Sequence, residues 1–363
     1  MQTMSDNVRR KRAVLMRKAK TNNLKHIAER LGLSVSTVSR VVNNKEYVKE
    51  DTRRRVMEAL NECNYVPNEI ARSLKSKTTH TIGVVLPDIS EVFFGEIVKG
   101  INKIVSDEGY TVVIVDTNES KKNEQKYLEI LYQKRIDALV LATVDLNGDS
   151  VKVFLDHSIP VIFIDNVPKL ENINSVTINN RGASKLAIDF LIKNGHRDIA
   201  TIIGSKEETT GSERMQGYIE ALEAAGISVN ENLIEYGNYK ESSGYNCMCN
   251  LLSKRKENPF SAVYVTSEMM VFGAVKAIKE NGLIIPDDIS LIGFDVHDKT
   301  GLVRPSIATI RQPEKLIGKI TGEMLLQELN SKENQGDSLD MPTRQVILEP
   351  HLFGGESVKK INN

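Results

Sequence analysis

Short apolar runs alternate with amphipathic segments through most of this chain. Seven runs rich in Val, Ile and Leu have the length of strands and span 81–87, 111–116, 137–143, 160–165, 198–204, 261–267 and 289–295. Helical spacing is found between them, in 94–108, 121–135, 181–194, 212–225 and 268–281. Continuous apolar strands separated by helices are typical of parallel sheets covered on both faces. Because these runs extend over more than 200 residues, we expect two α/β halves that meet near the polar stretch 175–182.

The region before these strands has a helical pattern instead. Its first apolar residues fall at i, i+3, i+4 and i+7 on one helix face; they are Leu24, Ile27, Ala28 and Leu31. Gly32 can end this helix, and Ser34 can cap a second helix over about 35–43. A third helix, capped near Asp51 or Thr52, should bury Val56, Ala59, Leu60 and Cys63. Two helices joined by a short Gly-containing turn, with a third as buttress, form a helix-turn-helix.

The charge of the chain is divided between its two regions. Residues 1–80 hold 18 Lys and Arg against 8 Asp and Glu, whereas the other 283 residues hold 30 against 40. A basic head on an acidic body indicates that the head meets a polyanion. A three-helix packing module with a solvated charged face is the alternative, but it does not predict such a division.

The second helix is the candidate for reading DNA. In a helix-turn-helix, the N-terminal residues of this helix meet base edges in the major groove. Burial of Val38 directs Val35, Ser36, Ser39 and Arg40 outward. A valine can contact a thymine methyl group, a serine can bond either base edge, and an arginine can bind guanine bidentately. The pattern therefore predicts sequence-specific DNA binding.

Other classes of protein are not indicated. No apolar run reaches the ~18–20 residues of a spanning helix, and the basic N-terminus lacks the apolar segment of a secretory signal. Cys63, Cys247 and Cys249 form no disulfide or metal framework and suit a reducing cytoplasm. No G-x-S-x-G, P-loop or G-x-G-x-x-G motif is present, so we expect no enzyme, cofactor or metal site. The Gly195-His196 pair is expected to end a helix rather than to catalyse a reaction.

Three blocks of the sequence resemble a known family. "IAERLGLSVSTVSRVVNN", "YVPNEIARSLKSKTTHTIGVVLPDIS" and "ISLIGFD" are similar to the LacI/GalR family of bacterial transcriptional regulators, over about residues 23–355. The resemblance implies an all-α helix-turn-helix DNA-binding domain plus an α/β periplasmic-binding-protein-like domain made of two doubly wound parallel-sheet subdomains. It also implies a cytoplasmic, nucleoid-associated homodimer on a palindromic operator, with a small effector in the cleft between the subdomains.

Matched by position, the resemblance assigns DNA contacts to two segments. In the helix-turn-helix, Val35, Ser36 and Arg40 read bases, and phosphate or positioning contacts come from Ser34, Thr37, Ser39, Tyr47 and Thr52. Segment 68–77 becomes a hinge helix that pairs with its copy in the minor groove, with contacts from Asn68, Ala71 and Leu74. A helix this short is marginal in water without such a partner, and Leu74 would wedge between base steps. An ordinary linker is the alternative.

The effector site is expected beyond the carboxyl ends of the strands. That rule selects residues directly after strands, among them Phe93, Phe94 and Asp165. Matched by position, the resemblance implies effector contacts from Phe93, Arg214, Tyr239, Ser267 and Asp295. Rings with carboxylates and a guanidinium suit a polyhydroxylated ligand. The alternatives are a core position for one of the two phenylalanines and a capping role for Asp165.

Two departures from the family pattern bear on the effector. Glu208 stands where the purine-binding member of the family has a basic residue, and Ser267-Glu268 replaces a commoner Asn-Asp pair. The first disfavours an anionic base, and the second alters the pattern of acceptors and donors. With Glu208, Glu268 and Asp295 near the cleft, we expect a neutral sugar or nucleoside rather than a sugar phosphate. We therefore expect a dimeric repressor of a carbohydrate-utilisation operon, released by a neutral sugar-like effector. The alternative is a catabolite-control regulator activated on DNA by a phosphorylated carrier protein, to which "LVRPSIATIRQP" around Arg304 is similar.

The expected domain limits follow from these assignments. A basic N-terminal extension, expected to be disordered, precedes the helix-turn-helix domain, the hinge and linker, and the effector-binding and dimerisation domain; these span 1–21, 22–67, 68–79 and 80–355. The subdomains are expected at about 80–179 with 310–340, and about 180–309 with 341–355. "SIATIRQP" should return the chain to the first half. The tail 356–363 has no heptads, so a C-terminal tetramerisation bundle is not expected.

Overall fold

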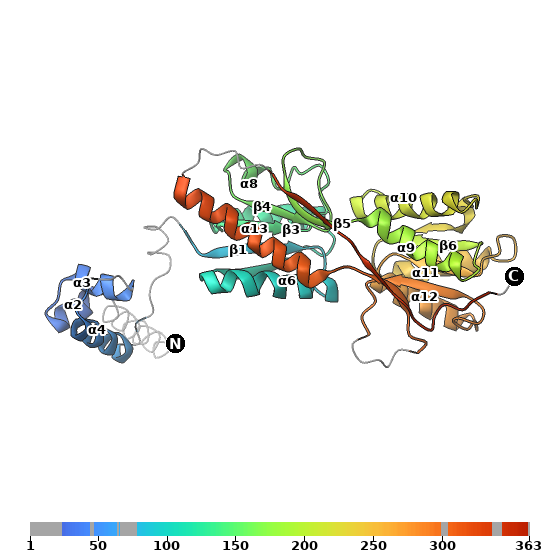
Figure 1. Cartoon of the computed structure of the whole chain (residues 1–363). Coiled ribbons are helices and arrows are strands. Elements are labelled where there is room, and N and C mark those ends of the chain that lie inside the picture. The colour runs from blue at the N-terminus through green and yellow to red at the C-terminus, as the bar shows by residue number, and fades with distance from the viewer. Residues whose placement is uncertain are drawn as a thin grey trace, which may run out of the picture. The chain divides into compact units, whose positions relative to one another are not determined.

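The computed structural model describes residues 24–43, 47–63, 65, 78–298, 304–335 and 343–361. The chain divides into two compact units, Met1–Thr79 and His80–Asn363 (Figure 1). The expected extension 1–21 and the predicted hinge 68–77, with Asn68, Ala71 and Leu74, lie outside the described residues. Among the described residues, no helix is both long and apolar enough to cross a bilayer.

The first unit is the predicted three-helix arrangement. Its helices are α2 (Leu24–Leu31), α3 (Val35–Val42) and α4 (Glu50–Glu62). Gly32 follows α2 with a φ of 65°, and the Ser34 hydroxyl accepts a hydrogen bond from the Thr37 backbone N–H at 3.1 Å, which caps α3. The three helices share one core of Ile27, Ala28, Val38, Val41, Val56, Ala59 and Leu60.

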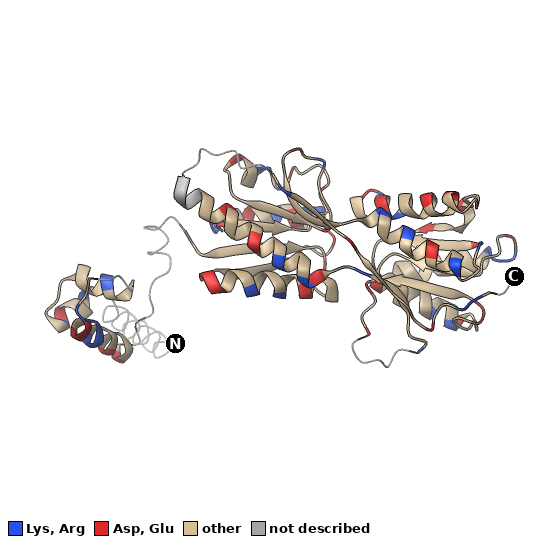
Figure 2. Ribbon diagram, viewed as in Figure 1, with Lys and Arg blue, Asp and Glu red and all other residues tan. Residues whose placement is uncertain are grey.

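The start of α4 differs from the prediction. Its N-cap is Lys49, which makes no side-chain capping bond, so the expected cap at Asp51 or Thr52 is wrong. Asp51 lies inside the first turn, beside Glu50 and 2.9 Å from Arg54. Carboxylates at that position are favourable because a helix is positive at its N-terminus. Figure 2 shows acidic and basic residues together on α4.

The first half of the second unit is a six-stranded parallel sheet within the described residues. Its strand order is β11-β5-β4-β3-β1-β2. These strands are β1 (Thr81–Leu86), β2 (Thr111–Asp116), β3 (Ala138–Leu141), β4 (Val161–Ile164), β5 (Asn174–Ile178) and β11 (Gln345–Leu348). Side chains of β1 alternate between the faces: Ile82 and Val84 pack with α6 (Val92–Val105) and α13 (Glu314–Gln335), and Val85 packs with α7 (Lys121–Gln133) and α8 (Lys152–Asp156).

The second half has the same plan. Its strand order is β12-β10-β9-β8-β6-β7, with only β12 antiparallel among the described strands. These strands are β6 (Ile199–Ile203), β7 (Ile234–Tyr236), β8 (Ala262–Val265), β9 (Ser290–Phe294), β10 (Ala308–Arg311) and β12 (His351–Phe353). The covering helices are α9 (Asn180–Lys193), α10 (Thr209–Ala224), α11 (Glu241–Ser253) and α12 (Glu268–Glu280), and short 3-10 turns lie at η1 (Ser106–Glu108) and η2 (Glu231–Leu233).

The chain crosses between the halves three times, as expected, but two boundaries are corrected. It crosses from β5 to α9, from β10 to α13, and from β11 to β12. "SIATIRQP" does not return to the first half, because β10 pairs with β9 of the second sheet. Residues 341–355 are not all in the second half, because β11 pairs with β5 of the first sheet. The alternating exposure of β11 makes it an amphipathic edge strand, unlike the continuous apolar runs by which the other strands were identified.

Close packing of α6 against α13 generates a prediction about stability. A Cβ added at Gly318 would lie 2.3 Å from the backbone oxygen of Ile97 on α6. Gly318→Ala should therefore lower the free energy of unfolding by roughly 1–3 kcal/mol, the usual cost of overpacking. Gly95→Ala on α6 is the control, because its added methyl group meets nothing within 4 Å. Thermal and urea unfolding of both variants measure the difference, and equal stability would contradict the close packing.

Candidate DNA-reading helix and ligand cleft

The exposed side of α3 carries the predicted base-reading residues. Val35 is 46% exposed although it is apolar, and Ser36 and Arg40 are exposed as well. Within the part of the chain that the structure describes, Arg40 has no hydrogen bond or ion pair. A methyl surface, a hydroxyl and an unengaged guanidinium on one helix side match the groups that contact base edges.

The predicted positioning residues differ in what they already do within the unit. The Ser34 hydroxyl caps α3 and lies 2.8 Å from the Thr37 hydroxyl. Ser39 is half-buried, and its backbone oxygen accepts a hydrogen bond from the Asn43 side chain at 2.7 Å. Tyr47 is 98% exposed with a φ of 53°, and Thr52 is half-buried in the first turn of α4. Ser34 and Ser39 therefore make hydrogen bonds that stabilise the two ends of α3, in addition to any contact with DNA.

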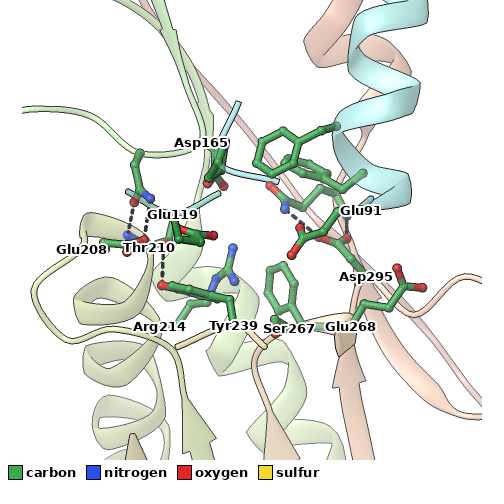
Figure 3. Close-up of a pocket in the computed structure, with 16 residues that line it drawn as sticks. Glu91, Glu119, Asp165, Glu208, Thr210, Arg214, Tyr239, Ser267, Glu268 and Asp295 are labelled. Carbon is green, nitrogen blue, oxygen red and sulfur yellow. Dashed lines mark hydrogen bonds between the residues drawn. The ribbon is translucent and has the colours of Figure 1, made fainter. Parts of the chain in front are cut away.

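A pocket lies in the second unit where loops from both sheets meet (Figure 3). It contains about 540 Å³ of empty space, part of it open to solvent. All seven predicted effector residues line it: Phe93, Phe94, Asp165, Arg214, Tyr239, Ser267 and Asp295. The further lining residues are Pro87, Glu91, Glu119, Asn166, Glu208, Thr210, Glu268, Phe294 and Gln312. Residues that are far apart in the sequence thus line one pocket, as the strand-end rule predicts.

The two phenylalanines in the first turn of α6 line this pocket. Phe93 and Phe94 are 5% and 3% exposed, and their rings meet edge to face with centroids 4.9 Å apart. Each also belongs to the hydrophobic core. A core position and a pocket position therefore do not exclude each other here, because both rings belong to the core and to the pocket wall.

Arg214 is held in place on three sides. Its Nε donates to the Asn180 side-chain oxygen and its Nη1 to the Thr266 backbone oxygen, each at 2.8 Å. Its guanidinium lies 3.7 Å from the centroid of the Phe294 ring. The side chain is 4% exposed, and its second terminal nitrogen has no hydrogen-bond partner among the described residues. A rigid guanidinium with one uncommitted edge is a preorganised donor for a ligand oxygen.

Asp295 links the pocket to the segment that leads into α13. Gln312 donates its backbone N–H to Oδ1 at 2.9 Å and its side-chain N–H to Oδ2 at 2.7 Å. Burial raises the pKa of Asp295 to about 6, although the two bonds from Gln312 oppose that shift. The carboxylate is therefore fixed in orientation and remains available as a hydrogen-bond acceptor at neutral pH.

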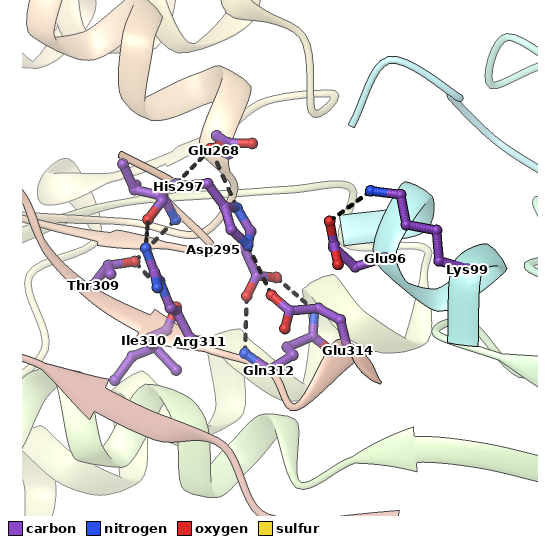
Figure 4. Close-up of polar contacts among 11 residues, drawn as sticks. Glu96, Lys99, Glu268, Asp295, His297, Thr309, Ile310, Arg311, Gln312 and Glu314 are labelled. Carbon is purple, nitrogen blue, oxygen red and sulfur yellow. Dashed lines mark hydrogen bonds and ion pairs between the residues drawn. The ribbon is translucent and has the colours of Figure 1, made fainter. Parts of the chain in front are cut away.

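His297 forms a second link to the same region (Figure 4). Its Nε2 lies 2.8 Å from a Glu314 oxygen at the start of α13, and its backbone N–H donates to Glu268 at 2.7 Å. Hydrogen bonding to Glu268 and then to Glu314 raises the pKa of His297 to about 9. The His297 imidazolium therefore lies between Glu268, which lines the pocket, and Glu314, the first residue of α13.

Of the remaining carboxyl groups, Glu119, Asp165 and Glu208 lie toward one side of the pocket and Glu91 lies beside Asp295 (Figure 3). Burial raises the pKa of Glu91 and of Glu119 to about 8, and the neighbouring Asp165 adds to both shifts. Glu208 accepts a hydrogen bond from Asn166 at 2.7 Å, yet burial still raises its pKa to about 7. Burial likewise raises the pKa of Asp165, with the charge of Arg214 opposing that shift.

His196 has a structural role, as expected. Its two ring nitrogens lie 2.8 Å from the Ser261 hydroxyl and 3.1 Å from the Lys359 backbone oxygen. The described residues contain no cluster of His, Cys, Asp or Glu arranged to hold a metal ion.

Sequence reasoning did not identify Glu91 or Glu119 as pocket residues. Glu119 follows β2 by three positions, after a left-handed turn in which Asn118 and Glu119 have φ values of 50° and 57°. The strand-end rule, applied to β2 as it was to the other strands, would have selected this segment. Glu91 is the N-cap of α6 and lies in the segment after β1 that the rule did select, but Phe93 and Phe94 were the residues chosen from it.

Two family models match the chain. "Bacterial regulatory proteins, lacI family" matches residues 23–68, and "Periplasmic binding proteins and sugar binding domain of LacI family" matches 79–349. The HTH-type transcriptional repressor PurR of Vibrio campbellii is 32% identical over 340 residues, which cover 93% of this chain and 99% of that protein.

Two solved structures with the same arrangement are also similar. A transcriptional regulator CelR–cellobiose complex matches with a TM-score of 0.70 and 27% identity, covering 92% of this chain and 99% of that one. A lac repressor dimer bound to operator and the anti-inducer ONPF matches with a TM-score of 0.79 and 26% identity, covering 93% and 99%.

The raised pKa values of the carboxyl cluster predict how stability depends on pH. Folded Glu119 keeps its proton up to about pH 8, whereas the unfolded chain releases it near 4.5. The contribution of Glu119 to the free energy of unfolding is therefore most favourable at low pH, and it should fall as pH rises from about 5 to about 8. We expect Glu119→Gln to reduce this loss by at least about 1.4 kcal/mol, the equivalent of one pKa unit. Urea unfolding at several pH values measures it, with Glu108→Gln at an exposed position as control; identical pH profiles would contradict the prediction.

Proposed function

This chain belongs to the LacI family of bacterial regulatory proteins, and we propose that it is a homodimeric repressor released from a palindromic operator by a small, polyhydroxylated effector. As a member of that family it is a DNA-binding transcriptional regulator, and the family consists of regulators rather than enzymes. The target would be a carbohydrate-utilisation operon in the bacterial cytoplasm. The proposal of a polyhydroxylated effector rests on one observation: a fixed guanidinium, several carboxyl groups and aromatic rings line one pocket.

The chemistry of the pocket supports a sugar-like ligand over a phosphorylated one. Phe93, Phe94 and Phe294 offer apolar ring faces, and Arg214 and Asp295 offer a donor and an acceptor for adjacent hydroxyl groups. A phosphate would have to sit beside Glu119 and Glu208, which repel an anion. The matched family model, described as a sugar-binding domain, and the cellobiose complex of CelR add support.

The dimer and the operator are proposed on physical grounds. A helix-turn-helix dimer binds two half-sites related by a two-fold axis, so its operator is palindromic. The similar lac repressor is a dimer on its operator. Hinge contacts from Asn68, Ala71 and Leu74 remain a prediction.

The test is fluorescence anisotropy of the full chain on a labelled palindrome with a central CG step. It is run at one fixed salt concentration, because DNA affinity depends steeply on ionic strength, and with a panel of sugars, sugar phosphates and nucleosides. Tight binding released by a sugar or nucleoside supports the proposal. Tight binding that no compound releases favours the catabolite-control alternative and its carrier-protein partner. Equal affinity for a scrambled duplex would reject the operator.

Arg40 should contribute to affinity and to specificity. Arg40→Ala should weaken operator binding by roughly tenfold to a hundredfold, since a bidentate base contact contributes about 1–3 kcal/mol of discrimination. Binding to a scrambled duplex should fall much less. Arg197→Ala removes the same charge from an exposed position of the second unit and serves as the control. A uniform loss on both duplexes would assign Arg40 to phosphate instead of bases.

Asp295 should couple ligand binding to release. Asp295→Ala removes an acceptor from the pocket and both bonds to Gln312, so the effector should no longer release the operator. DNA affinity without effector should stay within about threefold, because the predicted DNA-reading residues belong to the other compact unit and the substitution leaves them unchanged. The same anisotropy titration measures both quantities, with the exposed Asp107→Ala as control. A variant that still responds would remove Asp295 from the effector site.

A further inference from the structure

The pocket has more negative groups than its single cation can balance. Six carboxyl groups line it, namely Glu91, Glu119, Asp165, Glu208, Glu268 and Asp295. Asp295 is bonded to Gln312, Glu268 to His297, and Asp165 lies in the field of Arg214. Among the described residues, Glu119 and Glu208 make no ion pair; the charge of Arg214 acts on Glu208 without cancelling the effect of its burial, and Lys240, which acts on Glu119, is exposed at the start of α11.

These two carboxyl groups come from different halves of the unit. Glu119 follows β2 of the first sheet, and Glu208 is the N-cap of α10 in the second half. Figure 3 shows both at the same end of the pocket, near Thr210. Each raises the free energy of the other's charged form. If both were ionised they would repel each other across the pocket, so without a compensating cation burial and this repulsion favour their protonated forms.

A feature independent of the acids indicates that this pocket takes a ligand. Arg214 is more than nine-tenths buried, lines the same pocket and keeps one nitrogen without a partner among the described residues. A metal ion does not account for the acids, because the described residues hold no suitable cluster. Neutral hydroxyl groups would supply no positive charge to balance Glu119 and Glu208 in their ionised forms.

We propose that the effector carries a protonated amine, or a comparable cationic group, on a polyhydroxylated ring, and that Glu119 and Glu208 bind this group from opposite halves of the cleft. The inference rests on the proposed function, because it concerns the ligand of the same site. A cation between the two carboxylates exchanges their repulsion for two charge-assisted hydrogen bonds. It thereby stabilises the closed arrangement of the halves. Arg214 and Asp295 then bind hydroxyl groups at the other end of the ring.

The affinity of a cationic ligand should depend on pH. In the empty pocket Glu119 and Glu208 hold protons near neutrality, since burial raises the pKa of both. Asp165 adds to both shifts and Asp88 adds to that of Glu119, whereas Lys240 opposes the shift at Glu119, and hydrogen bonds from Asn166 and Tyr239 and the charge of Arg214 oppose it at Glu208. A cationic ligand releases these protons, so its affinity rises with pH as long as the amine stays protonated. A neutral ligand releases none and shows no such rise.

The test compares compounds that differ only by an amine. Glucosamine with glucose, galactosamine with galactose, and 3′-amino-3′-deoxyadenosine with adenosine are titrated into the full chain by calorimetry and thermal shift between pH 5.5 and 7. For at least one pair, the amine should bind roughly tenfold or more tightly than its hydroxyl match, as expected for a hydrogen bond to a charged group. Its affinity should rise across this pH range.

Variants separate a role in recognition from loss of folding. Glu119→Gln and Glu208→Gln should each reduce the preference for the amine by roughly tenfold and abolish the rise with pH, with little effect on the hydroxyl match. Unfolding does not explain such a result, because removing a buried acid should maintain or raise stability near pH 7. Glu108→Gln, exposed and away from the pocket, should behave as wild type.

The outcomes distinguish this inference from the proposed function. If no amine is preferred over its match, or no amine binds, the inference is overturned. If a neutral sugar then releases the operator in the anisotropy experiment, the proposed function stands without it. If the chain prefers an amine but does not distinguish operator from scrambled duplex, the inference stands and the proposed operator is rejected.

Discussion

Every part of the ligand pocket depends on the direction of the strands. Parallel strands bring the residues that follow them to one edge of a sheet, and here the loops of both sheets meet at one pocket. Residues as distant as Glu91 and Gln312 therefore line the same space. The arrangement also strains the backbone, because Glu119, Asp165, Tyr239 and Asp295 all have left-handed φ values between 54° and 64°. Such conformations are unfavourable for residues with a side chain, so the surrounding packing must hold them in place.

Much of the fold could be predicted because seven of the described strands have continuous apolar runs, including the edge strand β2. The seven runs correspond to β1, β2, β3, β4, β6, β8 and β9. The strands that were missed are short or lie at or near sheet edges, where one side meets solvent and the apolar run is broken. β5 begins with Asn174 and Ser175, and β7 and β12 have three residues each. The two boundary corrections have the same origin, since both concern β10 and β11.

The site was predictable to the extent that the strand-end rule and the family resemblance both apply. Arg214 and Asp295 follow from both, and they lie in the pocket. Neither source indicates which side chain of a loop turns inward, because this depends on a left-handed turn such as that at Asn118 and Glu119. The excess of acid in the pocket was therefore underestimated: Glu208 and Glu268 were noted, whereas Glu91 and Glu119 were not. Their proximity is a property of tertiary structure, since the four glutamates come from four different loops.

Two polar links explain how the pocket can act on the geometry of the unit. Asp295 is bonded twice to Gln312, just before α13, and His297 joins Glu268 to Glu314 at the first residue of α13. Because α13 packs on α6 in the first half, each link joins the end of β9 in one half to the other half. A ligand donor at Asp295 or Glu268 uses lone pairs that these links also use. If the pocket binds the proposed effector, occupancy would change the contacts that link the two halves. The proposed control by a small molecule requires this property, and here it would arise from placing pocket carboxylates at the crossing of the chain.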